Sequence, residues 1–121
     1  MTTTLGPTTD LIALADGILS GKVPVPGGRA PRAAAVVARQ ALEEEITLKC
    51  AQLAEFVHRP RMRSQLILLR HHDRELGQKA QIAWDGLSQA CHHHAYELQP
   101  TVTEVRSLLR LVMDVAEGSF R

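Results

Sequence analysis

Residues 31–58, PRAAAVVARQALEEEITLKCAQLAEFVH, are the stretch that decides the fold. Apolar side chains recur there at steps of three or four residues, which places them on one face of an α-helix. Pro31 suits a first helical turn, and Pro60 disfavours helical geometry at the residue before it. We therefore predict one long helix from Pro31 to about His58. Its buried face is predicted to be Ala35, Ala38, Leu42, Ile46, Cys50, Leu53 and Val57, with Glu43, Glu44 and Glu45 turned to solvent.

Two more helical segments follow this stretch. The first covers residues 61–72, and Ile67 and Leu68 widen its apolar face, which predicts a well-buried centre. The second runs from Arg74 to about His94, directly after Asp73, a residue type that caps helix N-termini. Its apolar positions match a helical period and are Leu76, Ala80, Ala83, Trp84, Leu87, Cys91 and His94.

The last helical segment begins after Pro100. Thr101 and Glu104 have the spacing of a capping box, and Gly118 suits the helix end. The segment has two apolar sides. One side contains Val102, Val105, Leu109, Val112 and Ala116, and the other contains Leu108, Leu111 and Val115. A helix of this kind is either central in its own fold or half-covered by another chain, so we expect a homodimer or a partner protein.

Residues 1–30 differ from the rest of the chain. Residues 1–8 suggest a flexible lead, residues 9–19 a short helix, and residues 20–30 a linker rich in glycine and proline. We predict that this 1–30 region precedes a helical bundle domain over residues 31–121. The one strand-like piece, Lys22 to Pro26, contains two prolines that cannot donate to a sheet. The predicted fold is all-α, a compact bundle of four main helices plus a short N-terminal helix.

The composition bounds the class of protein. The chain has 121 residues, a net charge of +1, and 45% hydrophobic and 22% charged residues, as expected for one globular domain. Aromatic residues make up only 3%, which argues against an aromatic platform for single-stranded nucleic acid. Two cysteines, Cys50 and Cys91, do not form a disulfide scaffold, and the apolar segment 11–19 is about half the length that spans a bilayer. We expect a cytoplasmic protein without membrane contact.

Six histidines lie in three places: His58, the pair His71-His72, and the run from His92 to His94. Consecutive helical residues point about 100° apart, so the three members of the run cannot bind one metal ion together. Cys91 and His94 could share an ion only with ligands from another helix, and the sequence lacks the CxxC and HExxH signatures. We therefore predict no metal and no cofactor.

Residues 58–72 form a basic segment, with four arginines and no acidic residue. The arginines are Arg59, Arg61, Arg63 and Arg70. Such a patch can bind RNA phosphates with a salt-dependent affinity. The alternative is a solvated helix face whose charge is balanced elsewhere in the chain. RNA is therefore one candidate partner.

His94-Ala95-Tyr96 resembles the His-x-Tyr part of the motif in HEPN domains. These are small all-helical proteins, often dimeric, and many are RNA-cleaving toxins or antiphage effectors. The family motif also has an arginine shortly before the histidine, and this sequence has none there. The resemblance implies His94 or His93 as the catalytic histidine, Tyr96 beside it, and Arg63 or Arg70 as the clamp on the RNA phosphate. The longer segment 84–101 is similar to segments of uncharacterised small actinobacterial proteins, which implies no activity.

Three functions stay open at this point. The first is a small helical-bundle binding or assembly module, a homodimer, in which His94 closes the core and Tyr96 seals the helix end. The second is a HEPN-like ribonuclease that needs no metal, because a histidine can move a proton at neutral pH. The third is an interaction protein that responds to pH through its histidine cluster.

Overall fold

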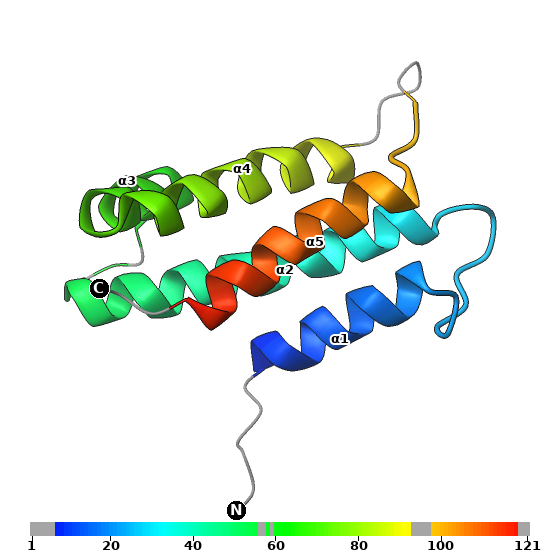
Figure 1. The fold of residues 1–121 in the computed structure, drawn as a ribbon, viewed down its shortest axis with the longest axis horizontal. Coiled ribbons are helices and arrows are strands. Elements are labelled where there is room, and N and C mark those ends of the chain that lie inside the picture. Colours follow the sequence, from blue (N-terminus) through cyan, green and yellow to red (C-terminus); the bar gives the residue numbers. More distant parts are fainter. Residues whose placement is uncertain (1–6, 56–57, 59, 93–97, 119–121) are drawn as a thin grey trace, which may run out of the picture.

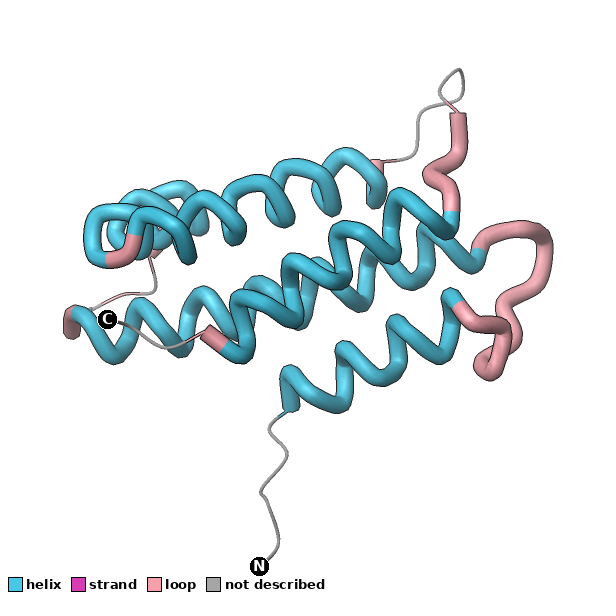
Figure 2. The backbone as a smooth tube through the Cα atoms, viewed as in Figure 1, coloured by secondary structure: helices cyan, strands magenta, loops and turns pink. Residues whose placement is uncertain are grey.

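The computed structural model describes residues 7–55, 58, 60–92 and 98–118. Within these ranges the chain contains five helices and no strand (Figure 2), which confirms the predicted all-α fold. The helices are α1 (Pro7–Leu19), α2 (Ala30–Leu53), α3 (Met62–His72), α4 (Arg74–Cys91) and α5 (Val102–Glu117). Helix α1 therefore begins two residues earlier than the sequence pattern predicts.

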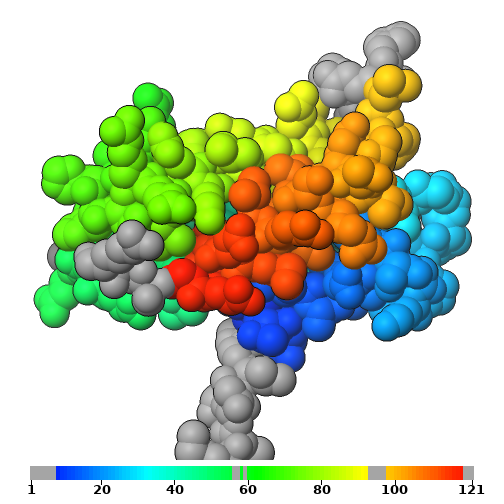
Figure 3. Space-filling model, in the orientation of Figure 1, coloured from blue at the N-terminus to red at the C-terminus, as the bar shows by residue number. Residues whose placement is uncertain are grey.

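The longest helix, α2, runs along the whole molecule, and α5 lies against it with α1 on one side and α4 on the other (Figure 1). Helix α5 fills the centre of the visible face between α1 and α4 in Figure 3. Helix α3 packs beside the N-terminal half of α4 and against α2. Among the described residues, the C-terminal half of α4 has no such neighbour on that side.

The core follows the predicted helix faces. Helices α1 and α2 make the most extensive helix contact, because the first half of α2 offers small side chains to α1. Buried residues of α1 join the core built by residues 31–118. The buried positions on these two helices are Ala15, Ile18, Leu19, Ala34, Ala35, Ala38, Ala41, Leu42, Ile46 and Cys50.

Helix α5 is central in the bundle. Its first apolar side is buried at Val105, Leu109 and Val112, and the second side is buried or half-buried against the same chain. Three helices, α1, α2 and α4, pack around it. The two-sided apolar pattern is therefore explained within one chain and does not require a partner. The homodimer stays a prediction and needs a different surface.

The predicted helix ends are confirmed where local hydrogen bonds set them. Asp73 Oδ1 accepts from the Leu76 amide at 3.1 Å, which caps α4. Thr101 Oγ1 accepts from the Glu104 amide at 3.1 Å and the Glu104 carboxylate accepts from the Thr101 amide at 3.4 Å, forming the capping box of α5. Gly118 is the C-cap of α5, and its amide donates to Asp114 O at 3.0 Å.

Two predicted helix ends are wrong. Helix α2 ends at Leu53 rather than near His58, because Ala54 is already extended with φ −156° and ψ 150°. The chain must turn back there so that α3 can pack on α2, where Thr47 Oγ1 donates to Gln65 Oε1 at 2.9 Å and Cys50 Sγ to Gln65 O at 3.3 Å. Gln65 Nε2 also donates to Pro60 O at 2.9 Å and holds the turn.

Helix α4 ends at Cys91, not near His94. His92 has φ −74° and ψ 124°, an extended conformation, so no continuous helix runs from Trp84 to Tyr96. The chain has to reverse direction before α5 begins. Histidine has a modest helix propensity, so the histidine run favours continuation of α4 only weakly. His93, His94 and Tyr96 lie outside the described residues.

Two predictions about solvent exposure are also wrong. Ile67 is 62% exposed, because α3 packs through Gln65, Leu66 and Leu69 and leaves Ile67 on its outer side. The side chain of Glu45 is only 14% exposed, since its carboxylate pairs with the buried Lys49.

Candidate functional site

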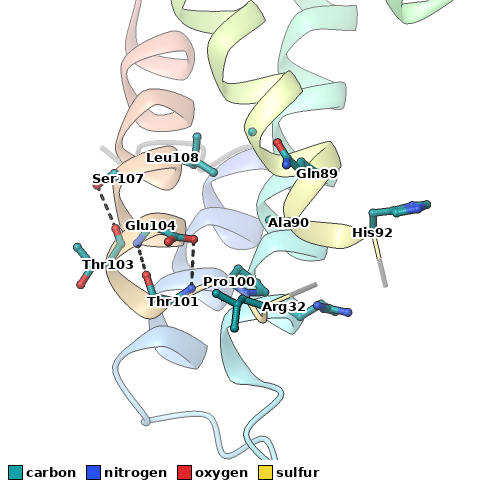
Figure 4. A pocket seen from close by; sticks show the side chains of 12 residues that line it. Arg32, Gln89, Ala90, His92, Pro100, Thr101, Thr103, Glu104, Ser107 and Leu108 are labelled. Atoms are coloured by element: carbon teal, nitrogen blue, oxygen red, sulfur yellow. Dashed lines mark hydrogen bonds between the residues drawn. The ribbon is translucent and has the colours of Figure 1, made fainter. Parts of the chain in front are cut away.

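A groove lies where α4 ends and α5 begins (Figure 4). It has a volume of about 710 Å³. Gly86, Ala90 and Leu108 form its apolar wall, and polar groups line its mouth. The polar lining residues are Arg32, Gln89, His92, Thr101, Thr103, Glu104 and Ser107.

The side chains in Figure 4 divide this groove into an inside and a rim. Leu108 of α5 reaches toward α4, and the Glu104 carboxylate is held against Thr101 by the capping box. His92 and Arg32 extend in the opposite direction, away from α5. The groove therefore combines an apolar wall with the Glu104 carboxylate, and the cationic groups lie toward the outer side of α2 and α4.

That outer side contains a second group of residues that the two helices bring together. The Arg39 guanidinium of α2 stacks on the Trp84 ring of α4, 4.5 Å from its centroid. Burial raises the pKa of the Cys91 thiol, and the positive charges of Arg39 and Arg32 oppose that rise. Both guanidinium groups therefore act on the same thiol. The net rise in pKa keeps the thiol protonated at neutral pH, so Cys91 is not an activated nucleophile.

Buried polar atoms here lack the hydrogen bonds they could make. Among the described residues, no group bonds to Arg39 Nε or to Ser88 Oγ, although both atoms are buried. Ser88 follows Trp84 by one helical turn. Buried polar atoms without a hydrogen bond cost free energy in a folded protein.

A smaller groove of about 300 Å³ adjoins the first and shares Arg32 with it. Gly27 and Gly28 have φ angles of 72° and 68°, a conformation that other residues rarely adopt, and they turn the loop so that Val25 lines this groove. The other lining residues are Arg29, Ala33, Val36 and Gln99. We call Arg29, Arg32, Arg39 and His92, with these two grooves, the arginine end.

The predicted RNA clamps, Arg63 and Arg70, lie elsewhere, on the exposed side of α3. Arg63 lines a third groove with Ile67, Trp84 and Asp85 among its neighbours. Arg70 lies against Gly77, where an added Cβ would collide with the Arg70 backbone. His92 follows Gly77 by 15 residues along α4, which is about 22 Å at the rise of an α-helix. Arg70 and the end of α4 are thus at opposite ends of the bundle.

Sequence reasoning missed Arg32 and Arg39. The signal was present, since residues 17–42 contain four basic residues and no acidic one. Arg32 and Arg39 are also seven residues apart, as are Trp84 and Cys91, which places each pair on one helix face. The resemblance directed attention to arginines close to the histidines in sequence, whereas Arg32 comes near His92 only in the fold.

Metal ligands and membrane spans were also sought in the part of the chain that the structure describes. There, no three side chains of His, Cys, Asp or Glu come close enough together to hold a metal ion. Of the described helices, none combines the length and apolar character that crossing a bilayer requires.

Comparisons with known proteins supply no family for this chain: no family model, no curated protein and no solved structure matches it.

Proposed function

We propose that the chain is a small helical-bundle binding and assembly module that forms a homodimer. The observation that carries this proposal is the exposure of two isoleucines on neighbouring helices, Ile67 of α3 at 62% and Ile82 of α4 at 57%. Ile82 lies one turn before Asp85, and Asp85 lines the same groove as Ile67. We call this surface the α3–α4 face, formed by Arg63, Leu66, Ile67, Gln81, Ile82, Trp84 and Asp85.

Exposed apolar side chains that share a face favour association. Burying each isoleucine in an interface would contribute about 2 kcal/mol through the hydrophobic effect. The face also has a groove of about 420 Å³ between α3 and α4. The exposed side of α4 has one charge among Gln78, Ile82, Asp85 and Gln89, and interface centres are typically poor in charge.

A second copy of the chain fits this face better than an unrelated partner. A two-fold symmetric interface uses the same patch on both chains, so the patch must complement itself. The α3–α4 face has both signs of charge, in Arg63 and Asp85, and both a protruding apolar side chain, Ile82, and a groove. Each feature can therefore meet its complement across a two-fold axis.

Sedimentation equilibrium of the wild-type chain and of the double variant Ile67→Ser/Ile82→Ser tests this proposal. We expect a wild-type dimer and at least a tenfold weaker dimer in the double variant, because about 1.4 kcal/mol corresponds to a factor of ten. Val36→Ser is the matched control, since Val36 is 51% exposed but lies at the arginine end. A monomeric wild type, or an equal loss in the control, contradicts the proposal.

A HEPN-like ribonuclease that needs no metal is the second candidate. The observation that favours it is the shared groove of Arg32 and His92, which puts a guanidinium at the point where the histidine run begins. A positioned cation of this kind is what phosphate-ester cleavage needs and what the motif lacks in sequence. In this candidate function, Arg32 rather than Arg63 or Arg70 would hold the phosphate, and His93 or His94 would be the catalytic histidine.

Incubation of the purified chain with mixed RNA in the presence of EDTA tests the nuclease. Activity should be lost in His94→Ala and Arg32→Ala and retained in Arg63→Ala, with all three variants folded by circular dichroism. Intact RNA after incubation at high protein concentration would reject this candidate.

A further inference from the structure

Ser64 is an exposed serine in the first turn of α3, beside the α3–α4 face. It precedes Ile67 by three residues, and residues at that spacing on a helix are neighbours, with about 5 to 6 Å between their Cβ atoms. The Ile67 side chain is 62% exposed. The Ser64 hydroxyl therefore lies next to the apolar surface through which we propose that two copies of the chain associate.

The residues before Ser64 form a basic pattern. Arginines stand one, three and five positions before it, at Arg63, Arg61 and Arg59. No other serine or threonine of the sequence has an arginine three positions before it. Arg61 and Arg63 are exposed. Guanidinium groups pair with carboxylates, and protein kinases select their substrates by charge patterns of this kind, so the segment suits a kinase whose substrate groove is acidic.

The backbone before Ser64 is close to the extended form in which such a groove would bind it. Arg61 is extended, with φ −63° and ψ 152°, and α3 begins only at Met62. The hydrogen bond from the Gln65 amide to Arg61 O, 3.1 Å long, closes the first turn. Because helix ends fray, opening this one turn presents Ser64 in an extended segment and leaves the rest of α3 folded.

We infer that Ser64 accepts a phosphoryl group from a nucleoside triphosphate and that the added phosphate dissociates the dimer. Ser64 Oγ forms a bond to the γ-phosphorus, and the bond from that phosphorus to the oxygen that bridges it to the β-phosphate breaks. The nucleoside diphosphate leaves with that bond's electron pair, and the hydroxyl proton passes to a base of the kinase. This inference rests on the proposed function, because the dimer it regulates is the one formed by the α3–α4 face.

A phosphate at Ser64 opposes association for two reasons. It carries a charge of about −1.5 to −2 at pH 7, and placing that charge at an apolar interface costs desolvation energy. Arg63 is also the one cation that lines the groove of this face, opposite in charge to Asp85. A phosphate beside Arg63 would engage this guanidinium and would repel Asp85 of a second copy.

The helix itself tolerates the phosphate. The first turn of α3 contains no acidic residue, and no side chain caps its N-terminus. Negative charge is favourable at a helix N-terminus, so α3 should keep its structure when Ser64 is modified. Dissociation of the dimer is therefore expected without unfolding of the chain.

Incubation of the folded chain with ATP, Mg²⁺ and a purified protein kinase that selects arginine three positions before serine tests the modification. We expect one phosphoryl group by intact mass, none on Ser64→Ala, and at least a tenfold lower kcat/KM for Arg61→Ala. Ser107→Ala is the matched control and should be modified like the wild type, since Ser107 is exposed and follows Arg106 but has Glu104 three positions before it. A chain that is not modified at Ser64 would overturn the inference.

Sedimentation equilibrium of the modified chain tests the effect on the dimer. We expect at least a tenfold weaker dimer, a change in the same direction for Ser64→Glu, and a dimer within about twofold of wild type for Ser64→Ala and Ser107→Glu. Circular dichroism should show the same helix content before and after phosphorylation. A wild-type dimer that Ile67→Ser/Ile82→Ser weakens but phosphate leaves unchanged, or a loss of helix on phosphorylation, overturns this inference alone. A monomeric wild type contradicts the proposed function as well.

Discussion

Positively charged side chains have different surroundings at the two ends of α2. Near its C-terminus, Lys49 is 8% exposed, and its Nζ donates to Glu45 Oε1 at 3.0 Å and to Gly118 O at 2.9 Å. Near its N-terminus, Arg29 and Arg32 line a groove with Val25, Val36 and Gln99, and Arg39 covers Trp84. We call the first region the paired end. A cation with a buried internal partner contributes to the fold, whereas the guanidinium groups near the N-terminus of α2 lie at the surface of the bundle or on an aromatic ring.

The largest effect on the free energy of unfolding is expected when the paired end loses its cation. Lys49→Met leaves the Glu45 carboxylate and the Gly118 carbonyl without their donor in a site where both are shielded from water. We expect a loss of about 4 kcal/mol in the free energy of unfolding, measured by urea titration, because a half-broken buried ion pair leaves an uncompensated charge. Adding Glu45→Gln to the variant should recover part of this loss. A change under about 0.5 kcal/mol in the single variant, typical of a surface site, would show that the pair is not buried in solution.

The two regions also differ in how closely their helices approach. A Cβ at Gly77 would collide with the Arg70 backbone, which cannot give way, so Gly77→Ala should cost about 2 kcal/mol by displacing α3. A Cβ at Gly86 would meet the flexible Leu108 side chain at 2.6 Å instead. Gly86→Ala should therefore stay within about 1 kcal/mol of wild type, helped by the better helix propensity of alanine. Parallel thermal melts of the two variants check this, and equal losses would count against the close contact of α3 and α4.

Arg39 tests whether a cation at the arginine end also contributes to the fold. Arg39→Ala removes the guanidinium from Trp84 and should lower the free energy of unfolding by about 1 kcal/mol. Because Trp84 is the only tryptophan, its fluorescence reports the change directly, with a red-shifted emission as water reaches the ring. An unchanged spectrum would mean that the stacking does not persist in solution.

The smallest expected effect completes the comparison. Arg29→Ser should change the free energy of unfolding by less than about 0.5 kcal/mol, since Arg29 is exposed and exposed charges contribute little to stability. A large loss of stability in urea titration would show that Arg29 contributes to the fold and would remove the difference between the two ends.

Much of the fold could be predicted because helices leave local signals. The apolar period located all five helices, and Asp73, Thr101, Glu104 and Gly118 marked helix ends that the structure confirms. The predictions failed where contacts with distant parts of the chain determine a helix end or the exposure of a side chain. The ends of α2 and α4, and the exposure of Ile67 and Glu45, depend on how the chain turns back and on which neighbours it meets.

The candidate site was less predictable than the fold. The histidine run and the α3 arginines were found by their types and spacing, but His93, His94 and Tyr96 lie outside the described residues. The arginine end joins Arg32 to His92 across 60 positions of sequence. Helical periodicity shows which residues share a face, but it does not show which face of another helix they meet.

By itself, the sequence determined that this chain forms helices, where most of them begin, and which sides of them are apolar, because those properties arise from residues within one or two turns of each other. Only the tertiary structure decided which charged groups are paired inside the fold. Lys49 and Gly118 are 69 residues apart in the chain, and only the packing of α5 on α2 brings them together. At the other end of α2, helix packing places the Arg39 guanidinium over the Trp84 ring of α4, a contact between residues 45 positions apart that helical periodicity alone does not predict.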